Sequence, residues 1–502
     1  MGTVAKILSV APVGFDGQLV EVESDLTKGL PSFTVVGMAN KSIDEAKERV
    51  KSALANSLLE YPTKRITVNL APAELPKDGT HYDLPIALAI LTSSGQLRPN
   101  EVSGAVFAGE LALDGSIRPI TGAISIAETA KNHGINTIYL PKGTLAQAQL
   151  IEGVTLVGVS SLKELFLHLK GEVLIEAVAP QPPIVVTASS GAASLDDIAG
   201  QSQAKRALVI AAAGRHNLLM SGPPGAGKTM LGKALADLLP DLSRSEQLAI
   251  TKLHSLAGEL LEDTVHSRPF RSPHHTASRT ALIGGGTRPK PGEVSLAHLG
   301  VLFLDEVPEY PRSILEALRQ PIEDREVTIS RAGGRARYPS DFLLVATMNP
   351  CPCGYYGDKT KECTCTSTQI LSYQSRLSGP LLDRIDMKVS VGRVPHRELI
   401  HTKPSSIKQH TEAKNQIQTA LNQQRDRYGS SIQYNSSLSN KQLHSLAKAS
   451  PAAEALLLEA ASKLELSARA TFKTLKVART IADLESSQSI EPRHVSEALQ
   501  YR

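Results

Sequence analysis

The chain has 502 residues, of which 41% are hydrophobic and 21% are charged, and its net charge is +4. These proportions are typical of globular proteins and exclude a fibrous or wholly disordered chain. No apolar run reaches the ~18 residues that a membrane span needs, and the start of the sequence lacks the pattern of a secretion signal. We therefore expect a cytoplasmic protein without a membrane partner, built from about three domains.

The charge is unevenly distributed along the chain. Residues 401–502 hold 14 Lys and Arg against 9 Asp and Glu, whereas residues 1–170 carry a net charge of −2. A basic C-terminal part suits a polyanionic partner such as a nucleic acid. A helical domain with scattered lysines would have the same charge, so the charge alone leaves both interpretations open.

Hydrophobic patterns divide the chain into three domains and a linker. Residues 1–170 alternate between strand-like and helix-like segments, which predicts a mixed α/β domain. Residues 171–192 contain three prolines and end in small residues, so they predict a linker. A second α/β pattern occupies 193–400, and from 401 to 502 the strand signals stop and a helical domain is expected.

The segment NLLMSGPPGAGKTMLGKALADLL reads as a buried strand, a glycine-rich turn and a helix. The turn fits the pattern GxxxxGK[ST], in which backbone N–H groups converge on phosphate oxygens. The lysine of this pattern reaches the β- and γ-phosphates, and the hydroxyl of the next residue binds Mg²⁺. We therefore predict that ATP is bound by Gly222, Pro223, Pro224, Gly225, Ala226, Gly227, Lys228 and Thr229.

Two further strands end in polar residues that suit ATP hydrolysis. The apolar segment GVLFL is followed by Asp305 and Glu306, and the segment FLLVATM by Asn349. Asp305 is expected to hold Mg²⁺, and Glu306 to act as the general base for the attacking water. Asn349 would orient that water between the first two strands.

All four cysteines of the chain lie within fifteen residues, in the pattern C-P-C-x9-C-T-C. Four thiolates on the two arms of a hairpin can surround a tetrahedral Zn²⁺ ion, and four ligands leave no open position for catalysis. The alternative is a group of four reduced surface thiols. The candidate ligands of this structural zinc site are Cys351, Cys353, Cys363 and Cys365.

The segment EVTISRAGGRARYP predicts a β-hairpin that turns at Gly333–Gly334 and carries Arg331, Arg335 and Arg337. Basic side chains of this kind can follow a sugar–phosphate strand without reading its sequence. A charged hairpin that faces only solvent is the alternative. Aromatic residues make up 4% of the chain, so phosphate contact is the expected mode of any nucleic-acid binding rather than base stacking.

Several long motifs together resemble the magnesium-chelatase-like AAA+ ATPases: GPPGAGKT, FRSPHHTASRTALIGGG, PGEVSLAHLGVLFLDEVPE, LRQPIEDREVTISRAGG and ATMNPCPCGYYGD. The full layout resembles the YifB/ComM family within that group. The resemblance implies an α/β P-loop AAA+ module with a Lon-like α/β N-terminal domain and an all-helical C-terminal lid. It also implies that Asn349 is the sensor-1 residue, Arg384 the arginine finger that acts on a neighbouring subunit, and Arg469 the sensor-2 arginine.

The resemblance implies a homo-hexameric ring with the arginine hairpin in its central pore. The function expected first is an ATP-driven DNA motor, a branch-migration helicase that acts on single-stranded or branched DNA in natural transformation and recombination, together with recombination proteins. The second is a magnesium-chelatase-like ATPase that remodels a protein or a cofactor-inserting partner.

Residues 1–170 resemble the proteolytic domain of Lon-type proteases, in segments such as ELPKDGTHYDLPIALAIL and FAGELALDGSIRPI. Those enzymes use a serine that is deprotonated by a lysine. In this chain His81 stands at the serine position, and an isoleucine stands at the lysine position. We therefore expect this domain to be proteolytically inactive.

Overall fold

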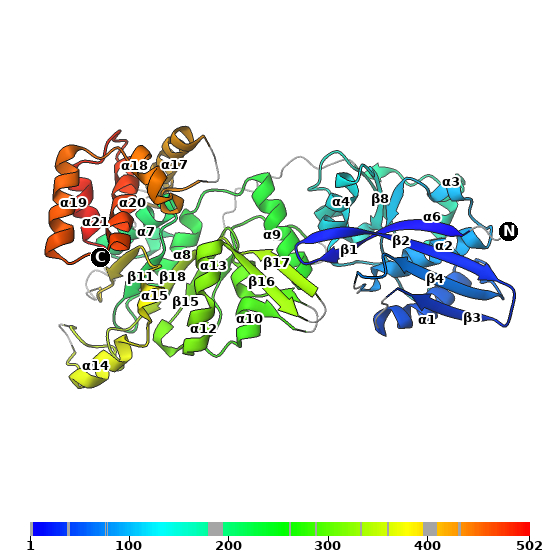
Figure 1. The fold of residues 1–502 in the computed structure, drawn as a ribbon, viewed down its shortest axis with the longest axis horizontal. Helices are drawn as coiled ribbons and strands as arrows, with labels where there is room; N and C mark the ends of the chain where they lie inside the picture. The colour runs from blue at the N-terminus through cyan, green and yellow to red at the C-terminus, as the bar shows by residue number, and fades with distance from the viewer. Residues whose placement is uncertain are drawn as a thin grey trace.

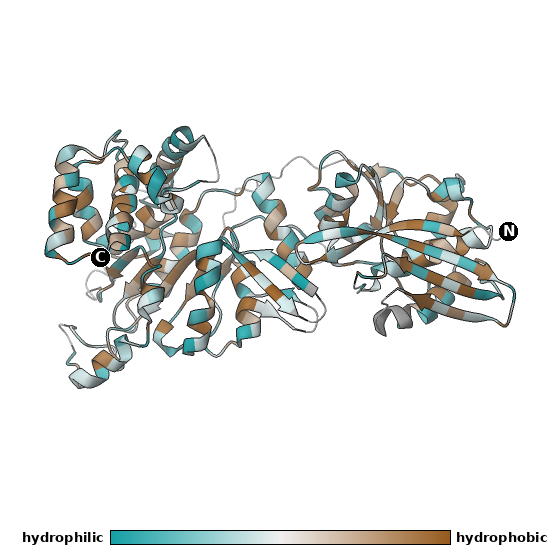
Figure 2. Cartoon of the chain, viewed as in Figure 1, coloured by the Kyte–Doolittle hydropathy of each residue, from teal (hydrophilic) through white to brown (hydrophobic). Residues whose placement is uncertain are grey.

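The chain is elongated, with its N-terminal unit at one end and a helical lid at the other (Figure 1). A nucleotide-binding module lies between them, and hydrophobic residues concentrate in the strands and in the helix faces that cover them (Figure 2). The structure is a computed structural model. It describes residues 4–37, 41–75, 77, 79–178, 194–260, 263–286, 289–331, 334–358, 361–394, 409–429 and 433–502.

The N-terminal unit is built on an eight-stranded mixed sheet with the strand order β10-β9-β8-β5-β1-β2-β4-β3. Side chains of β2 alternate between buried and half-buried, whereas β1 buries residues on both of its faces, Ile7 on one and Val10 on the other. The strands are β1 (Ala5–Val13), β2 (Asp16–Thr27), β3 (Ser32–Val36), β4 (Arg65–Ala71), β5 (Ala105–Phe107), β8 (Thr137–Pro141), β9 (Thr155–Val159) and β10 (Ala177–Val178).

Helices cover both faces of this sheet and create two separate cores. Helices α1 (Lys41–Asn56) and α2 (Asp83–Ser93) pack on one face, and α4 (Ala123–Asn132) packs on the other. Nearly every residue of α2 is buried, so this helix is apolar on all sides.

The N-terminal unit extends farther than residue 170, the predicted end of the domain. Strand β10 pairs antiparallel with β9, although its residues fall inside the predicted linker 171–192. Two residues are too few to show the alternation that marks a strand in sequence. The rest of that linker, residues 179–192, lies outside the described residues, as does the predicted boundary at residue 400.

The central module contains a five-stranded parallel sheet with the order β12-β15-β18-β11-β19. Its central strands are fully buried, which requires the continuous apolar runs seen in the sequence. Helices α7 (Ser202–Gly214) and α8 (Lys228–Leu238) pack on one face. The strands are β11 (Leu218–Ser221), β12 (Phe270–Arg271), β15 (Val301–Leu304), β18 (Leu343–Met348) and β19 (Met387–Ser390).

The lid contains only helices and their connections among the residues described after 409. It shares one continuous hydrophobic core with α7 and α8 of the nucleotide-binding module, so the two are packed together. Its α-helices are α17 (Gln409–Tyr428), α18 (Asn440–Leu446), α19 (Pro451–Lys463), α20 (Ala468–Leu484) and α21 (Pro492–Leu499). Across the described parts of the chain, every helix is too short or too polar to cross a bilayer.

The N-terminal unit contacts the nucleotide-binding module through the turn between β1 and β2. The Phe15 N–H donates a hydrogen bond of 3.2 Å to the carbonyl of Arg337, in strand β17 (Gly334–Pro339). The buried ammonium of Lys252 lies 4.2 Å from the centre of the Phe15 ring and forms an ion pair with Glu128. Lys252 belongs to α9 (Arg244–Ala257), so a buried charge and an aromatic ring join the two units.

Candidate ATP-hydrolysis site

The predicted phosphate-binding loop connects β11 to α8, in the strand–loop–helix order that the motif requires. Gly225 and Gly227 have φ values of +76° and +85°, which L residues with a side chain rarely adopt. A Cβ atom added at either position would meet no other atom within 4 Å, so both glycines border open space. The loop is therefore shaped to receive a ligand against its backbone.

Lys228 lies at the start of α8, and its side chain is turned back over the loop. Its Nζ donates hydrogen bonds of 2.6 Å to the carbonyl of Gly222 and 2.9 Å to Oδ1 of Asn349. Burial lowers the pKa of the Lys228 ammonium, against the opposing effect of Asp305 and Glu306. A buried ammonium whose hydrogen bonds go to neutral acceptors fits a phosphate ligand, so the loop suits ATP.

Asp305 and Glu306 follow strand β15 at the edge of the sheet where β11 and β18 also end. The backbone N–H of Glu306 donates 3.0 Å to the hydroxyl of Thr347, which in turn donates to the carboxylate of Asp305. Glu306 has a φ of +49°, and its side chain is exposed. Strained backbone of this kind concentrates at functional sites.

The structure thus brings Lys228, Asp305, Glu306 and Asn349 together, as their positions after parallel strands predict. Thr229 is exposed in the first turn of α8, where its hydroxyl is accessible to a metal ion at the loop. Hydroxyl and carboxylate oxygens are the ligands that Mg²⁺ prefers. Thr229 and Asp305 therefore fit a Mg²⁺ ion that accompanies ATP.

Arg384 and Arg469 lie together in a different cavity, of about 460 Å³, which contains no residue of the phosphate-binding loop. Arg384 follows α15 (Gly379–Leu382), and Arg469 is in the first turn of α20. One guanidinium nitrogen of each arginine contacts the same oxygen of Glu323, at 2.6 Å for Arg384 and 3.0 Å for Arg469. The finger role predicted for Arg384 and the sensor-2 role predicted for Arg469 stay predictions, since the cavity that holds both has no residue of the phosphate-binding loop in its lining.

The predicted arginine hairpin forms from β16 (Glu326–Arg331) and β17, which pair antiparallel. Val327, Ile329, Ala336 and Tyr338 turn into the core of the module. The side chains of Arg335 and Arg337 alternate with the last two and are exposed. The predicted turn at Gly333 and the side chain of Arg331 lie outside the described residues.

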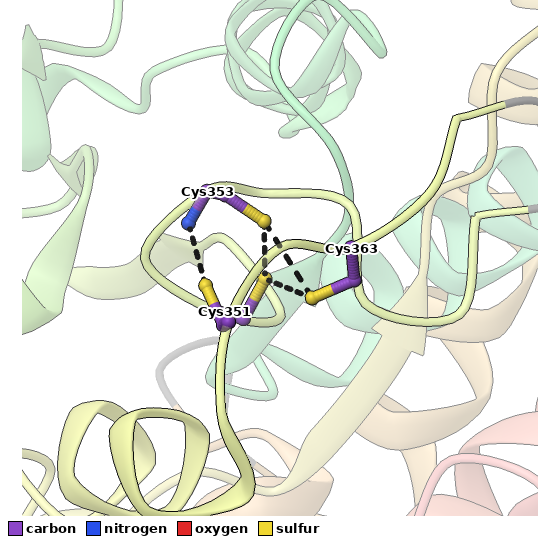
Figure 3. A group of neighbouring side chains, drawn as sticks. Cys351, Cys353 and Cys363 are labelled. Atoms are coloured by element: carbon purple, nitrogen blue, oxygen red, sulfur yellow. Dashed lines mark hydrogen bonds between the residues drawn. The ribbon is translucent and has the colours of Figure 1, made fainter.

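The four cysteines cluster after β18, with all their Sγ atoms within 4.8 Å of one another. Cys351, Cys353 and Cys363 have Sγ–Sγ distances of 3.3, 3.7 and 3.6 Å (Figure 3). A tetrahedral site with Zn–S bonds of ~2.3 Å has edges of ~3.8 Å, so the cluster is nearly the right size for zinc. The Tyr356 N–H donates to the sulfur of Cys351 at 3.3 Å, as backbone groups do around metal-bound thiolates.

The cysteine loop lies directly on the phosphate-binding loop. Gly354 directly follows Cys353 and has a φ of +85°. A Cβ atom added at this position would lie 2.5 Å from the Pro224 ring. Gln374 of α14 (Ser367–Gln374) donates 3.0 Å to the carbonyl of Pro350 and fixes the start of the loop. The conformation of the cysteine loop therefore helps to define one wall of the ATP site.

Two residues that organise these sites are not among those predicted from the sequence. Thr347 forms hydrogen bonds with both Asp305 and Glu306. In the sequence, the feature that could have pointed to it is a hydroxyl residue at the second-to-last position of an apolar strand. Glu323 pairs with Arg384 and Arg469 and lies in α13 (Arg319–Asp324), within the motif LRQPIEDREVTISRAGG, but nothing in that motif sets this carboxylate apart from its charged neighbours.

Family models match almost the whole described chain. The magnesium chelatase subunit ChlI model matches residues 194–399, the model of subunit ChlI of Mg-chelatase matches 22–144, and the ChlI C-terminal model matches 408–502.

Among curated relatives, the competence protein ComM of Haemophilus influenzae is 42% identical over 503 residues, which cover 100% of this chain and 97% of ComM. The protein YifB of Escherichia coli is 43% identical over 98% of this chain and 96% of its own length. A Lon protease of Leptospira interrogans is 28% identical over 34% of this chain and 21% of the protease.

These matches confirm the predicted fold class, a P-loop AAA+ module with a Lon-like N-terminal domain and a helical lid. The identity to ComM and YifB extends over nearly the full length of all three chains. The chain therefore belongs to the YifB/ComM family of magnesium-chelatase-like AAA+ ATPases.

Proposed function

We propose that this protein is an ATP-hydrolysing motor that moves DNA as a closed ring of identical subunits, a hexamer. The observation that carries the proposal is the separation of two sets of catalytic groups. Lys228, Glu306 and Asn349 lie at one site, and Arg384 and Arg469 lie in another cavity. Hydrolysis needs positive charge at the γ-phosphate, so one subunit's arginines must complete its neighbour's site.

Each residue at the loop has a role that its position allows. Lys228 binds the β- and γ-phosphates, and Glu306 removes a proton from the attacking water. Asn349 orients that water, and its hydrogen bond to Lys228 keeps both side chains at the site. Thr229 and Asp305 hold Mg²⁺, which when bound neutralises charge on the phosphate oxygens.

The DNA-binding elements would be the hairpins that project toward the centre of the ring. Arg335 and Arg337 are exposed on β17 and can contact backbone phosphates, which gives binding without sequence preference. Arg331, at the end of the opposite strand β16, has the same proposed role. Such contacts weaken as salt increases, because each releases condensed counterions.

Two further roles complete the proposal. The cysteine cluster holds a structural Zn²⁺ ion, supported by four thiols at tetrahedral spacing. The N-terminal unit is proteolytically inactive, because the buried His81 replaces the serine of the Lon-type pair. Since ComM is a competence protein, we place this motor in natural transformation and recombination, where branch migration on single-stranded or branched DNA is the activity that fits a ring motor.

The test is ATP turnover of the purified protein with no DNA, with single-stranded DNA and with a four-way junction, at low and moderate salt. We expect DNA to increase turnover and salt to reduce the increase. The double variant R335A/R337A should lose the DNA response, while the variant K463A, which removes an exposed charge of α19, should keep it. Glu306→Gln provides the inactive control.

Sedimentation with a non-hydrolysable ATP analogue measures the assembly. A monomer in the presence of both nucleotide and DNA would refute the proposal, because Arg384 would have no neighbouring site. ATP turnover that no DNA structure changes would refute DNA as the substrate and would favour the alternative, a remodelling ATPase that acts on a protein partner.

A further inference from the structure

Glu323 is the shared partner of the two arginines that the proposed motor supplies to a neighbouring subunit. Its Oε1 atom lies 2.6 Å from Arg384 Nη2 and 3.0 Å from Arg469 Nη2. Hydrogen bonding from Arg384 and, less strongly, from Arg469 keeps the pKa of Glu323 below its usual value. Both guanidinium groups are therefore paired with one carboxylate in this structure.

Arg384 is not fully satisfied by these contacts. Its Nη1 donates 2.6 Å to the carbonyl of Pro380, but its buried Nε has no hydrogen-bond partner among the described residues. A buried donor without an acceptor is costly, so this side chain has remaining capacity for an anion. A guanidinium binds carboxylates and phosphates in the same planar geometry, so a phosphate can take the place of Glu323.

The cavity around this pair has an excess of positive charge. Its lining includes Arg215, Arg325, Lys473 and Lys476 in addition to the two arginines, against four carboxylates. Lys473 donates 2.9 Å to the carbonyl of Ile385, one residue after Arg384, and so supports the segment that carries it. This lining suits a polyphosphate more than it suits a lone carboxylate.

Glu323 is also connected to the DNA-binding hairpin. Only Asp324 and Arg325 lie between Glu323 and the first residue of β16. The carbonyl of Arg325 accepts a hydrogen bond of 2.8 Å from Ser340, so the base of the hairpin is closed at this point. A change at Glu323 therefore acts on a segment that is continuous with the hairpin.

We propose that Glu323 is a positioning residue that pairs with Arg384 and Arg469 until the triphosphate of the neighbouring subunit replaces it. The exchange frees α13 and thereby links nucleotide arrival to movement of the β16–β17 hairpin. This inference rests on the proposed function. Glu323 would suppress ATP turnover in the absence of DNA and would couple turnover to DNA when DNA is present.

The test compares wild type with Glu323→Gln, which removes the charge at constant size, in turnover with and without DNA. The competing carboxylate is lost, so we expect DNA-free turnover to rise about twofold to thirtyfold, the effect of two partly exposed ion pairs. We expect the stimulation by DNA to fall by a similar factor. The matched control is Glu316→Gln, which removes a carboxylate of the preceding helix that pairs with Arg319 and should change neither value.

Two further variants separate positioning from structural damage. In an Arg384→Ala background, which lacks the proposed finger, Glu323→Gln should leave turnover low with and without DNA, because the arginine that Glu323 holds is absent. Glu323→Asp keeps the charge and should restore most of the DNA dependence. Thermal unfolding of each variant checks that the fold is intact.

The outcomes are distinct. If wild-type turnover responds to DNA and Glu323→Gln behaves like Glu316→Gln, the inference is wrong and the proposed function stands. A Glu323→Gln variant that loses turnover equally with and without DNA would also overturn the inference, since it would show no suppression. If wild-type turnover ignores DNA, the proposed function fails and this inference fails with it.

Discussion

Asp483 lies at the centre of a buried ionic network in the lid, and replacing it with asparagine tests the strength of that network. The side chains of Asp483 and Arg479 are both 0% exposed. Asp483 also accepts hydrogen bonds of 3.0 Å from Arg427 and 2.8 Å from Asn435. Asparagine keeps the size of the side chain but leaves two arginines without their counter-ion.

Loss of one partner of a buried ion pair destabilises a protein by about 3–5 kcal/mol, because the remaining charge is buried without compensation. At 1.36 kcal/mol for each factor of ten, this corresponds to about two to nearly four orders of magnitude in the opening equilibrium of the lid. Amide hydrogen exchange of α20 and α17, measured by mass spectrometry, reports that equilibrium directly.

The chain offers a matched control in α19. Glu459 and Lys463 have the same i,i+4 spacing as an ion pair, but their side chains are 60% and 73% exposed. Glu459→Gln should therefore change the free energy of opening by less than about 0.5 kcal/mol. If Asp483→Asn changed exchange no more than Glu459→Gln does, burial would not be the source of the stability, and the reasoning would be refuted.

Three other predictions concern the site and the module around it. Asn349→Ala should lower kcat for ATP about 10-fold to 100-fold with little change in nucleotide affinity, and an unchanged kcat would remove Asn349 from the mechanism. Elemental analysis should find about one zinc per chain, and Cys363→Ser should lose it; metal-free wild type would show that the thiols are simply reduced. Burial lowers the pKa of His298 to about 4. As the pH falls from 6.5 toward 4, this histidine therefore binds a proton in the unfolded chain but stays neutral in the folded chain. The free energy of unfolding has its full value above that range and should fall by about 2 kcal/mol between pH 7 and pH 5. Urea unfolding of the His298→Gln variant should lack this part of the decrease.

The ATP site could be predicted from sequence because its residues are marked by their position after strands. The segments before Gly222, Asp305 and Asn349 are apolar runs, and in a parallel sheet the ends of such strands meet at one edge. Local pattern and tertiary position therefore carry the same information here, and the structure brings the residues together.

The arginine cavity could not be assembled in this way. Arg384, Arg469 and Glu323 come from three segments separated by up to 146 residues, and each is a charged residue in or just after a helix. Their proximity depends on how the lid packs against the module, which no local pattern encodes. Family resemblance identified the two arginines, but nothing in the sequence indicated that they share one carboxylate.

The joint at Phe15 ties the arginine hairpin to the N-terminal unit. Its N–H binds the main chain of β17 beside Arg337, and a Cβ atom at Gly14 would already lie 3.3 Å from Ala336. The hairpin therefore cannot slide independently of residues 4–178 unless this bond breaks. Because α9 holds the same N-terminal unit through the ion pairs Lys252–Glu128 and Arg244–Glu152, the hairpin, α9 and this unit form one connected joint.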